Sequence, residues 1–160
     1  MDDRALIQHQ LATSHHIVKQ CLGDITPAEA SRLPEDVLAP IVWQVGHLAV
    51  SNRNFIERAG VTPATDLPER YAALFKTGTG GAADYPPLSE VVQAFDATHE
   101  ALTRAVVEAK LDTPIEVPPG RPRVFTNIGE MFSFADAHRW YHIGKITSLR
   151  ALLGKPRLFG

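Results

Sequence analysis

Four long stretches of the chain place apolar residues three and four positions apart, which is the spacing of a helix with one buried face. They cover about residues 3–22, 41–59, 88–110 and 127–153. Nowhere does the chain alternate apolar and polar residues between turn signals, as half-buried strands do. The pattern therefore predicts an all-α protein whose long helices pack together as a bundle.

Capping residues mark where several of these helices begin and end. Gly23 follows the first helix and Gly60 the second, where glycine commonly ends a helix. The run Thr26-Pro27-Ala28-Glu29 has the form of a capping box and predicts a short helical turn. Asn127 and Glu130 make a similar pair at the start of the fourth helix. The boundaries therefore rest on capping signals as well as on apolar spacing.

A long connection separates the second and third helices. Residues 60–87 contain four prolines and the segment Thr77-Gly78-Thr79-Gly80-Gly81, with room for one helical turn at residues 68–75. In a compact domain, a connection of this length is more often functional or partly mobile than a neutral spacer. We expect it to be largely irregular.

Composition and charge exclude several classes of protein. With 160 residues, 44% hydrophobic and 21% charged, the chain is average for a globular protein, and we expect one domain over residues 1–160. A net charge of −2, from 16 Lys and Arg against 18 Asp and Glu without runs of one sign, argues against nucleic-acid or membrane binding. No stretch approaches the ~20 apolar residues of a spanning helix, and no signal peptide is visible. A cytoplasmic protein is therefore expected.

The fourth helix carries two histidines on its predicted buried face. The inward positions there are Ile128, Met131, Ala135, His138, His142, Leu149 and Leu153. Residues four apart on a helix lie about 5–6 Å apart on one face, so the imidazoles of His138 and His142 can reach one point. Because Cys21 is the one cysteine of the chain, any metal would be held by histidine or carboxylate.

A third ligand has to come from another helix, and His47, in mid-helix among apolar residues, is the best candidate. Three imidazoles without a fourth protein ligand match the open arrangement of catalytic metal sites, and neutral imidazole suits zinc, nickel, copper or iron. The competing interpretation is that such histidines arise by chance and serve core packing or face solvent. Two buried imidazoles side by side would, however, need hydrogen-bond partners or would tend to charge and repel, so a shared cation explains them better.

Other polar residues are weaker candidates. His99 falls on the apolar stripe of the third helix, where a hydrogen-bonded core histidine is the first interpretation and a place in the substrate pocket the second. Ser51, one turn after the second helix's histidine, is a further candidate for contact with a bound ligand. His9, His15 and His16 have no spacing that joins them to the other histidines, so exposed or capping roles are expected.

Two segments resemble the DinB-like, or YfiT-like, metalloenzyme superfamily, which is unrelated to the DNA polymerase of similar name. The first is Ile41-Val42-Trp43-Gln44-Val45-Gly46-His47-Leu48-Ala49. The second begins at Asn127-Ile128-Gly129-Glu130-Met131, continues through His138-Arg139-Trp140-Tyr141-His142-Ile143-Gly144-Lys145-Ile146, and ends at Leu153-Gly154-Lys155-Pro156. The resemblance covers nearly the whole chain.

The resemblance implies an up-down-down-up four-helix bundle, frequently a homodimer, with a zinc or nickel ion on three histidines that correspond to His47, His138 and His142. Better-understood members are transferases and isomerases that use low-molecular-weight thiols such as bacillithiol or mycothiol, and many members have no assigned reaction. One departure is Lys145, where members often carry glutamine. The connection over residues 60–87 is where members differ most, so the resemblance does not define the substrate pocket.

An open three-histidine site is compatible with three functions. The preferred one is a transferase in which a divalent ion presents the sulfur of a low-molecular-weight thiol to an electrophilic small molecule, because such an ion stabilises a thiolate near neutral pH. The second is a metal-dependent hydrolase, for which the inward faces of the second and fourth helices offer no obvious carboxylate as general base. The third is a stress or ligand-binding protein that binds the metal without catalysis.

Overall fold

The chain forms six helices within the residues that the structure, a computed structural model, describes: 2–33, 38–62, 66–81, 84–116, 120 and 124–158. In these ranges the only β feature is an isolated bridge between Pro114 and Asn127. The prediction of an all-α protein is therefore confirmed. Parts of the predicted connection, at residues 63–65 and 82–83, and parts of the segment between the third and fourth long helices, at residues 117–119 and 121–123, lie outside the described residues.

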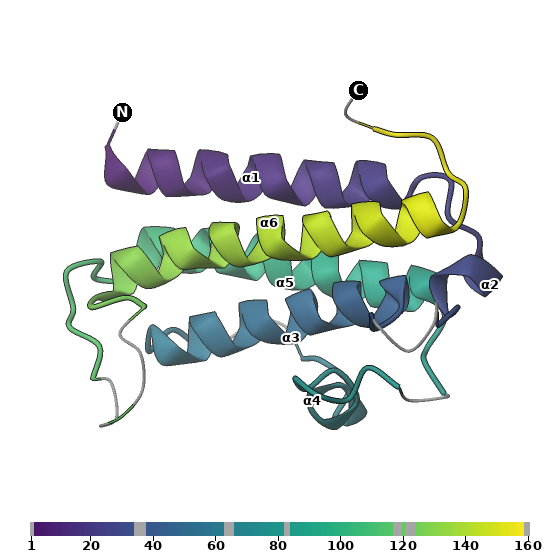
Figure 1. The fold of residues 1–160 in the computed structure, drawn as a ribbon. Helices are drawn as coiled ribbons and strands as arrows, with labels where there is room; N and C mark the ends of the chain where they lie inside the picture. The colour runs from purple at the N-terminus through teal and green to yellow at the C-terminus, as the bar shows by residue number, and fades with distance from the viewer. Residues whose placement is uncertain are drawn as a thin grey trace.

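Four long helices lie side by side, and two short ones lie in the connections between them (Figure 1). The helices are α1 (Asp3–Leu22), α2 (Pro27–Ala30), α3 (Ile41–Arg58), α4 (Arg70–Leu74), α5 (Leu88–Glu108) and α6 (Ile128–Leu152). In Figure 1, α1 and α6 run in one direction and α3 and α5 in the other. Both α1 and α3 contact α5 and α6. None of the helices in the described ranges is both long and apolar enough to cross a membrane.

The predicted caps are present at the starts of α2 and α6. Thr26 and Glu29 form the capping box of α2. Asn127 accepts a hydrogen bond from the backbone N–H of Glu130 at 2.9 Å, which satisfies one of the free donors at the start of α6. The Glu130 carboxylate accepts from the backbone N–H of Thr126, one residue earlier than in a standard capping box.

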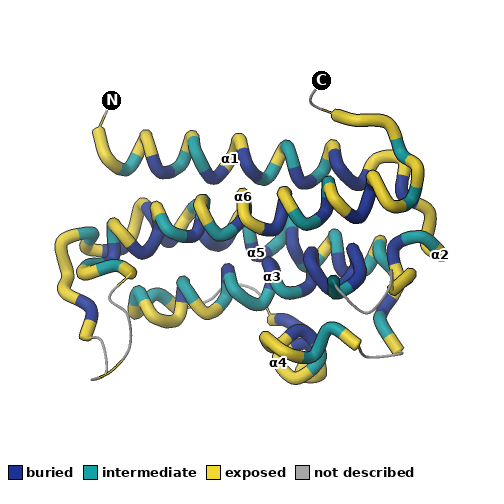
Figure 2. The backbone as a smooth tube through the Cα atoms, in the orientation of Figure 1, coloured by how far each residue is buried: buried dark blue, intermediate teal, exposed yellow. Residues whose placement is uncertain are grey.

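The core lies where the long helices face each other, and α6 buries a broader face than its sequence pattern predicted (Figure 2). Most of the predicted inward positions are buried, whereas His138 and Leu153 are only partly so. The buried residues of α6 that were not predicted are Phe132, Arg139, Ile143, Ile146 and Arg150. Because α6 packs against α1 and α3 at the same time, one narrow stripe cannot cover both contacts.

Gly46 allows the connection between α3 and α5 to pack tightly against α3. Phe75, the residue that ends α4, has a fully buried ring. A Cβ on Gly46 would lie 2.4 Å from this ring, far inside the distance at which carbon atoms pack. The missing side chain of Gly46 therefore makes room for Phe75, as glycine does where another segment approaches the backbone closely.

We expect Gly46→Ala to destabilise the protein by about 1–3 kcal/mol, because the added methyl group displaces the buried Phe75 ring. Gly144→Ala is the matched control: a Cβ at this helical position meets nothing within 4 Å. Alanine should stabilise α6 there by about 0.5–1 kcal/mol. Urea unfolding should therefore show changes of opposite sign, and an unchanged stability of Gly46→Ala would contradict the packing described.

Candidate metal site

The contact between α3 and α6 brings three histidines to one place. His47 comes from the middle of α3, and His138 and His142 come from successive turns of α6. The centroid of the His47 ring lies 5.3 Å from that of His138 and 5.0 Å from that of His142, and the α6 pair is 4.6 Å apart. One nitrogen from each ring lies within 4.8 Å of the other two. These are the three residues that the sequence singled out as candidate ligands.

A backbone carbonyl of the connection sets the tautomer of His47. Nδ1 of His47 lies 2.8 Å from the carbonyl oxygen of Phe75. Because a carbonyl oxygen only accepts, Nδ1 carries the ring proton and donates it, and Nε2 is left with a lone pair. Packing of Phe75 against Gly46 therefore also orients His47.

The side chain of Gln44 sets the tautomer of His142 in the same way. Nε2 of Gln44 donates to the carbonyl oxygen of Ala39 at 2.9 Å, so its Oε1 is the atom that faces Nδ1 of His142 at 2.6 Å. His142 therefore donates from Nδ1, and its Nε2 has a free lone pair. Histidines that bind metals in proteins are commonly held by such a bond from the other ring nitrogen.

The spacing of the ring nitrogens fits a single ion. Nε2 of His138 and Nε2 of His142 are 3.1 Å apart. Two imidazoles on a tetrahedral ion, with bonds of about 2.0–2.1 Å, place their nitrogens about 3.3 Å apart. Because all three donor atoms lie within 4.8 Å, the widest gap has to close by about 1.5 Å at most, which small side-chain rotations achieve. The residues present therefore fit a divalent ion.

Packing orients the third ring. Nδ1 of His138 is buried and has no hydrogen-bond partner among the described residues. The ring stacks on Phe134, with centroids 6.1 Å apart and planes 16° from parallel, and it meets the Phe55 ring edge to face at 6.4 Å. On the α3 side, Trp43 stacks on His47 at 4.8 Å. Aromatic side chains thus surround the site and strengthen electrostatic interactions inside it by excluding water.

Burial keeps the three imidazoles neutral at pH 7. It lowers the pKa of His138 to about 4 and that of His142 to about 2, and it also lowers the pKa of His47. The positive charge of Lys145 lowers the pKa of all three rings further, whereas the Phe75 carbonyl opposes the shift at His47. Neutral imidazole is the form that binds a metal, so these histidines are ready to bind one without first losing a proton.

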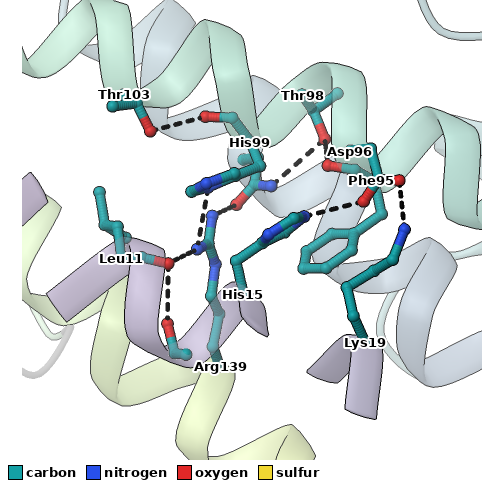
Figure 3. A network of polar contacts seen from close by, with 11 residues as sticks. Leu11, His15, Lys19, Phe95, Asp96, Thr98, His99, Thr103 and Arg139 are labelled. Carbon is teal, nitrogen blue, oxygen red and sulfur yellow. Dashed lines mark hydrogen bonds and ion pairs between the residues drawn. The ribbon is translucent and has the colours of Figure 1, made fainter. Parts of the chain in front are cut away.

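A second polar cluster surrounds the buried Arg139 (Figure 3). Its guanidinium donates to the carbonyl oxygen of Leu11 at 2.8 Å, to Nδ1 of His99 at 3.2 Å and to Oδ1 of Asn52 at 3.1 Å. The His99 ring also stacks on His15, with centroids 3.9 Å apart. His99 is therefore a hydrogen-bonded core histidine, in line with its first interpretation, and the structure does not bring it into the three-histidine group.

The remaining candidates lie as follows. Ser51 is half-buried on α3, and its contact with a ligand stays a prediction. His9 and His16 are exposed on α1, as expected. The expectation for His15 was wrong: its side chain is only 20% exposed, and Nε2 lies 2.8 Å from Oδ1 of Asp96. The sequence spacing within α1 could not show this contact, because Asp96 belongs to α5.

Sequence reasoning missed the groups that orient the rings. Gln44 lies three residues before His47, so it faces the same side of α3, and this spacing was the available signal. The carbonyl oxygen of Phe75 leaves no trace in the sequence, because every residue has one. The indirect signal was Gly46, a glycine inside a helical pattern, which commonly marks a close approach of another segment.

The fold and the site together define a class: an all-helical protein whose three-histidine cluster could hold a divalent metal ion. The sequence model of the DinB superfamily matches residues 10–146. The chain therefore belongs to the DinB superfamily, and the matched residues include all three histidines. No curated protein and no solved structure matches the chain.

Zinc binding at pH 6 is expected to release less than one proton, because His138 and His142 are already neutral in the folded protein and burial also lowers the pKa of His47. Isothermal titration calorimetry in buffers of different ionisation enthalpy measures this number. Three histidines with the ordinary pKa of about 6.5 would release roughly two protons at this pH. Such a release would contradict the effect of burial on the site.

Replacing Gln44 by methionine removes the acceptor for Nδ1 of His142 while keeping the volume of the side chain. We expect Gln44→Met to weaken zinc binding about 10- to 100-fold, because the ring loses its orientation. Gln20→Met, at an exposed position of α1, is the matched control and should bind zinc as the unchanged protein does. Competition with a chromophoric chelator measures both affinities. Equal affinities of the two variants would show that Gln44 does not orient the ring.

Proposed function

We propose that this protein is a metal-dependent transferase that joins a low-molecular-weight thiol to an electrophilic small molecule, at a zinc or nickel ion held by His47, His138 and His142. The observation that carries the proposal is the convergence of three neutral imidazoles in a group that contains no other histidine, cysteine or carboxylate among the described residues. A set of three protein ligands leaves a coordination position for a guest, as in catalytic rather than structural sites.

A divalent ion in this position supplies Lewis acidity, which lowers the pKa of a thiol or water that takes the open position. The chain's own residues prepare the site for it. The Phe75 carbonyl and Gln44 hold two rings with Nε2 free, and Phe134 packs against the third. Because these bonds exist before any ligand binds, little reorganisation is needed when the site is filled.

The proposed reaction makes one bond and breaks two. The thiol loses its proton to solvent, and the electron pair of the sulfur forms a bond to the electrophilic carbon. The leaving group of the second substrate departs with the electrons of the bond that held it. No oxidant or reductant takes part.

A hydrolase is less well supported. Water attack at such a site normally uses a nearby carboxylate as general base. The charged side chains that act on the pKa values of the three histidines are Lys145 and, at His138, Arg139, both of which are cationic. No carboxylate of the described residues acts on these imidazoles, whereas a positive site favours the anionic form of a thiol.

Further features belong to the same proposal. The directions of the four long helices support an up-down-down-up bundle, formed as one domain over residues 1–160. We propose a cytoplasmic homodimer that acts on a small molecule, with Ser51 as a candidate for substrate contact.

The test uses protein purified without a nickel column, loaded with zinc or nickel, and assayed with a panel of low-molecular-weight thiols and the electrophile 1-chloro-2,4-dinitrobenzene. With at least one thiol, the reaction should be about 100-fold or more faster in the presence of the unchanged protein than in the presence of a His47→Ala, His138→Ala double variant, because the variant loses the metal. A His9→Ala, His16→Ala variant is the matched control, since it removes two exposed histidines of α1 and should keep full activity.

The other functions give different results in this assay. Equal rates for the unchanged protein and the double variant, with every thiol, would rule out the transferase. Tight metal binding without turnover of any substrate would indicate the non-catalytic protein instead. Hydrolysis of activated esters by the loaded protein, without any thiol dependence, would indicate the hydrolase.

A further inference from the structure

Lys145 places a positive charge at the edge of the three-histidine site. It follows His142 by three residues and His138 by seven on α6, so the three side chains share one face of the helix. Lys145 is half-buried, and its ammonium lies over the Tyr141 ring, 4.3 Å from the centroid. Within the described part of the chain, no carboxylate forms an ion pair with it.

The charge of Lys145 acts on both sides of the site. It lowers the pKa of His138 and His142 on its own helix and also that of His47 on α3, which places it near all three rings. Arg139, the other charged side chain that acts on these histidines, is cationic as well. A divalent ion would add two more positive charges. Such an accumulation of charge in a partly buried place is unfavourable unless an anion balances it.

We infer that the guest bound at the three-histidine site carries a carboxylate, and that Lys145 is the specificity-determining residue that binds it. The inference rests on the proposed function, in which this guest is the thiol. The Lys145 ammonium has three N–H donors, and its contact with the face of the Tyr141 ring leaves donors available for a carboxylate of the guest. An acidic thiol therefore supplies both the sulfur for the open position and the counter-charge for Lys145, whereas an uncharged thiol leaves the lysine unpaired.

The exposed Tyr141 ring supports this role by holding the lysine in place. Its side chain is 59% exposed and also meets the His142 ring edge to face at 5.2 Å, so the tyrosine lies between the site and solvent. A lysine held against an aromatic ring loses less conformational freedom when it binds an anion than a lysine that moves freely. Because Lys145 lies near His142, a thiol whose sulfur is at the open position would bind it through a carboxylate close to that sulfur.

The test compares two thiols of similar size that differ in charge, 3-mercaptopropionate and 3-mercapto-1-propanol. Each is titrated into cobalt-loaded protein, and binding at the metal is followed by the sulfur-to-cobalt absorption band in the near ultraviolet. The ratio of the two dissociation constants measures the preference for the carboxylate. It is determined for the unchanged protein and for Lys145→Gln, Lys145→Arg and Lys145→Glu, with Lys110→Gln as a control at an exposed lysine.

The carboxylate preference should fall about fivefold in Lys145→Gln, which is the typical contribution of one ion pair near a surface. Arginine should retain it, glutamate should lower it further, and Lys110→Gln should leave it unchanged. Lys145→Gln should bind cobalt at least as tightly as the unchanged protein, because a positive charge beside the ion is removed, and its affinity for the uncharged thiol should fall less than its affinity for the carboxylate. A preference that is equal in the unchanged protein, Lys145→Gln and Lys145→Glu would overturn the inference.

The outcome is separable from that of the proposed function. If cobalt binds but neither thiol does, the thiol chemistry fails, and the same variants are titrated with imidazole and imidazole-4-acetate, which also differ by one carboxylate. A Lys145-dependent preference for the acetate would then still support the anionic guest. If none of these molecules reaches the bound cobalt, or if cobalt does not bind, the role given to Lys145 is wrong.

Discussion

The position of α6 against α3 decides whether the three imidazoles meet, and the buried guanidinium of Arg139 fixes that position. Arg139 directly follows His138 and donates to groups on α1, α3 and α5. Burial lowers its pKa to about 10, so it remains charged at neutral pH. A slide of α6 by one residue, about 1.5 Å, would break these bonds and leave a buried charge unpaired, at a cost of several kcal/mol. The same contacts that close the core therefore set His138 and His142 opposite His47.

The connection between α3 and α5 is part of the site. Through Phe75 it supplies the carbonyl that orients His47, and the ring of the same residue packs on Gly46. The indole N–H of Trp43, which stacks on His47, donates to Oγ1 of Thr79 in the glycine-rich segment at 3.2 Å. The backbone of this connection thereby links the close packing at Gly46 to the tautomer of His47.

The sequence predicts those features whose signals are local. Helix starts follow from capping residues such as Asn127, and the pairing of His138 with His142 follows from the helical period alone. Placing His47 beside them needed one more step, namely that a metal held by two histidines of one helix needs a third ligand from another helix. The width of the buried face of α6 and the partners of Arg139 could not be predicted, because they depend on which helices pack on each side. The contact of His15 with α5 escaped prediction for the same reason.

The most direct measurement of the central claim is anomalous diffraction at the zinc absorption edge, from crystals of the protein with one equivalent of zinc. The expected result is one strong peak with Nε2 of His47, His138 and His142 about 2.0–2.1 Å away. Nδ1 of His47 should still donate to the Phe75 carbonyl oxygen, and Nδ1 of His142 to Gln44. A peak bound by other residues, or one that His47 does not reach, would contradict the claim that the two helices together form a metal site.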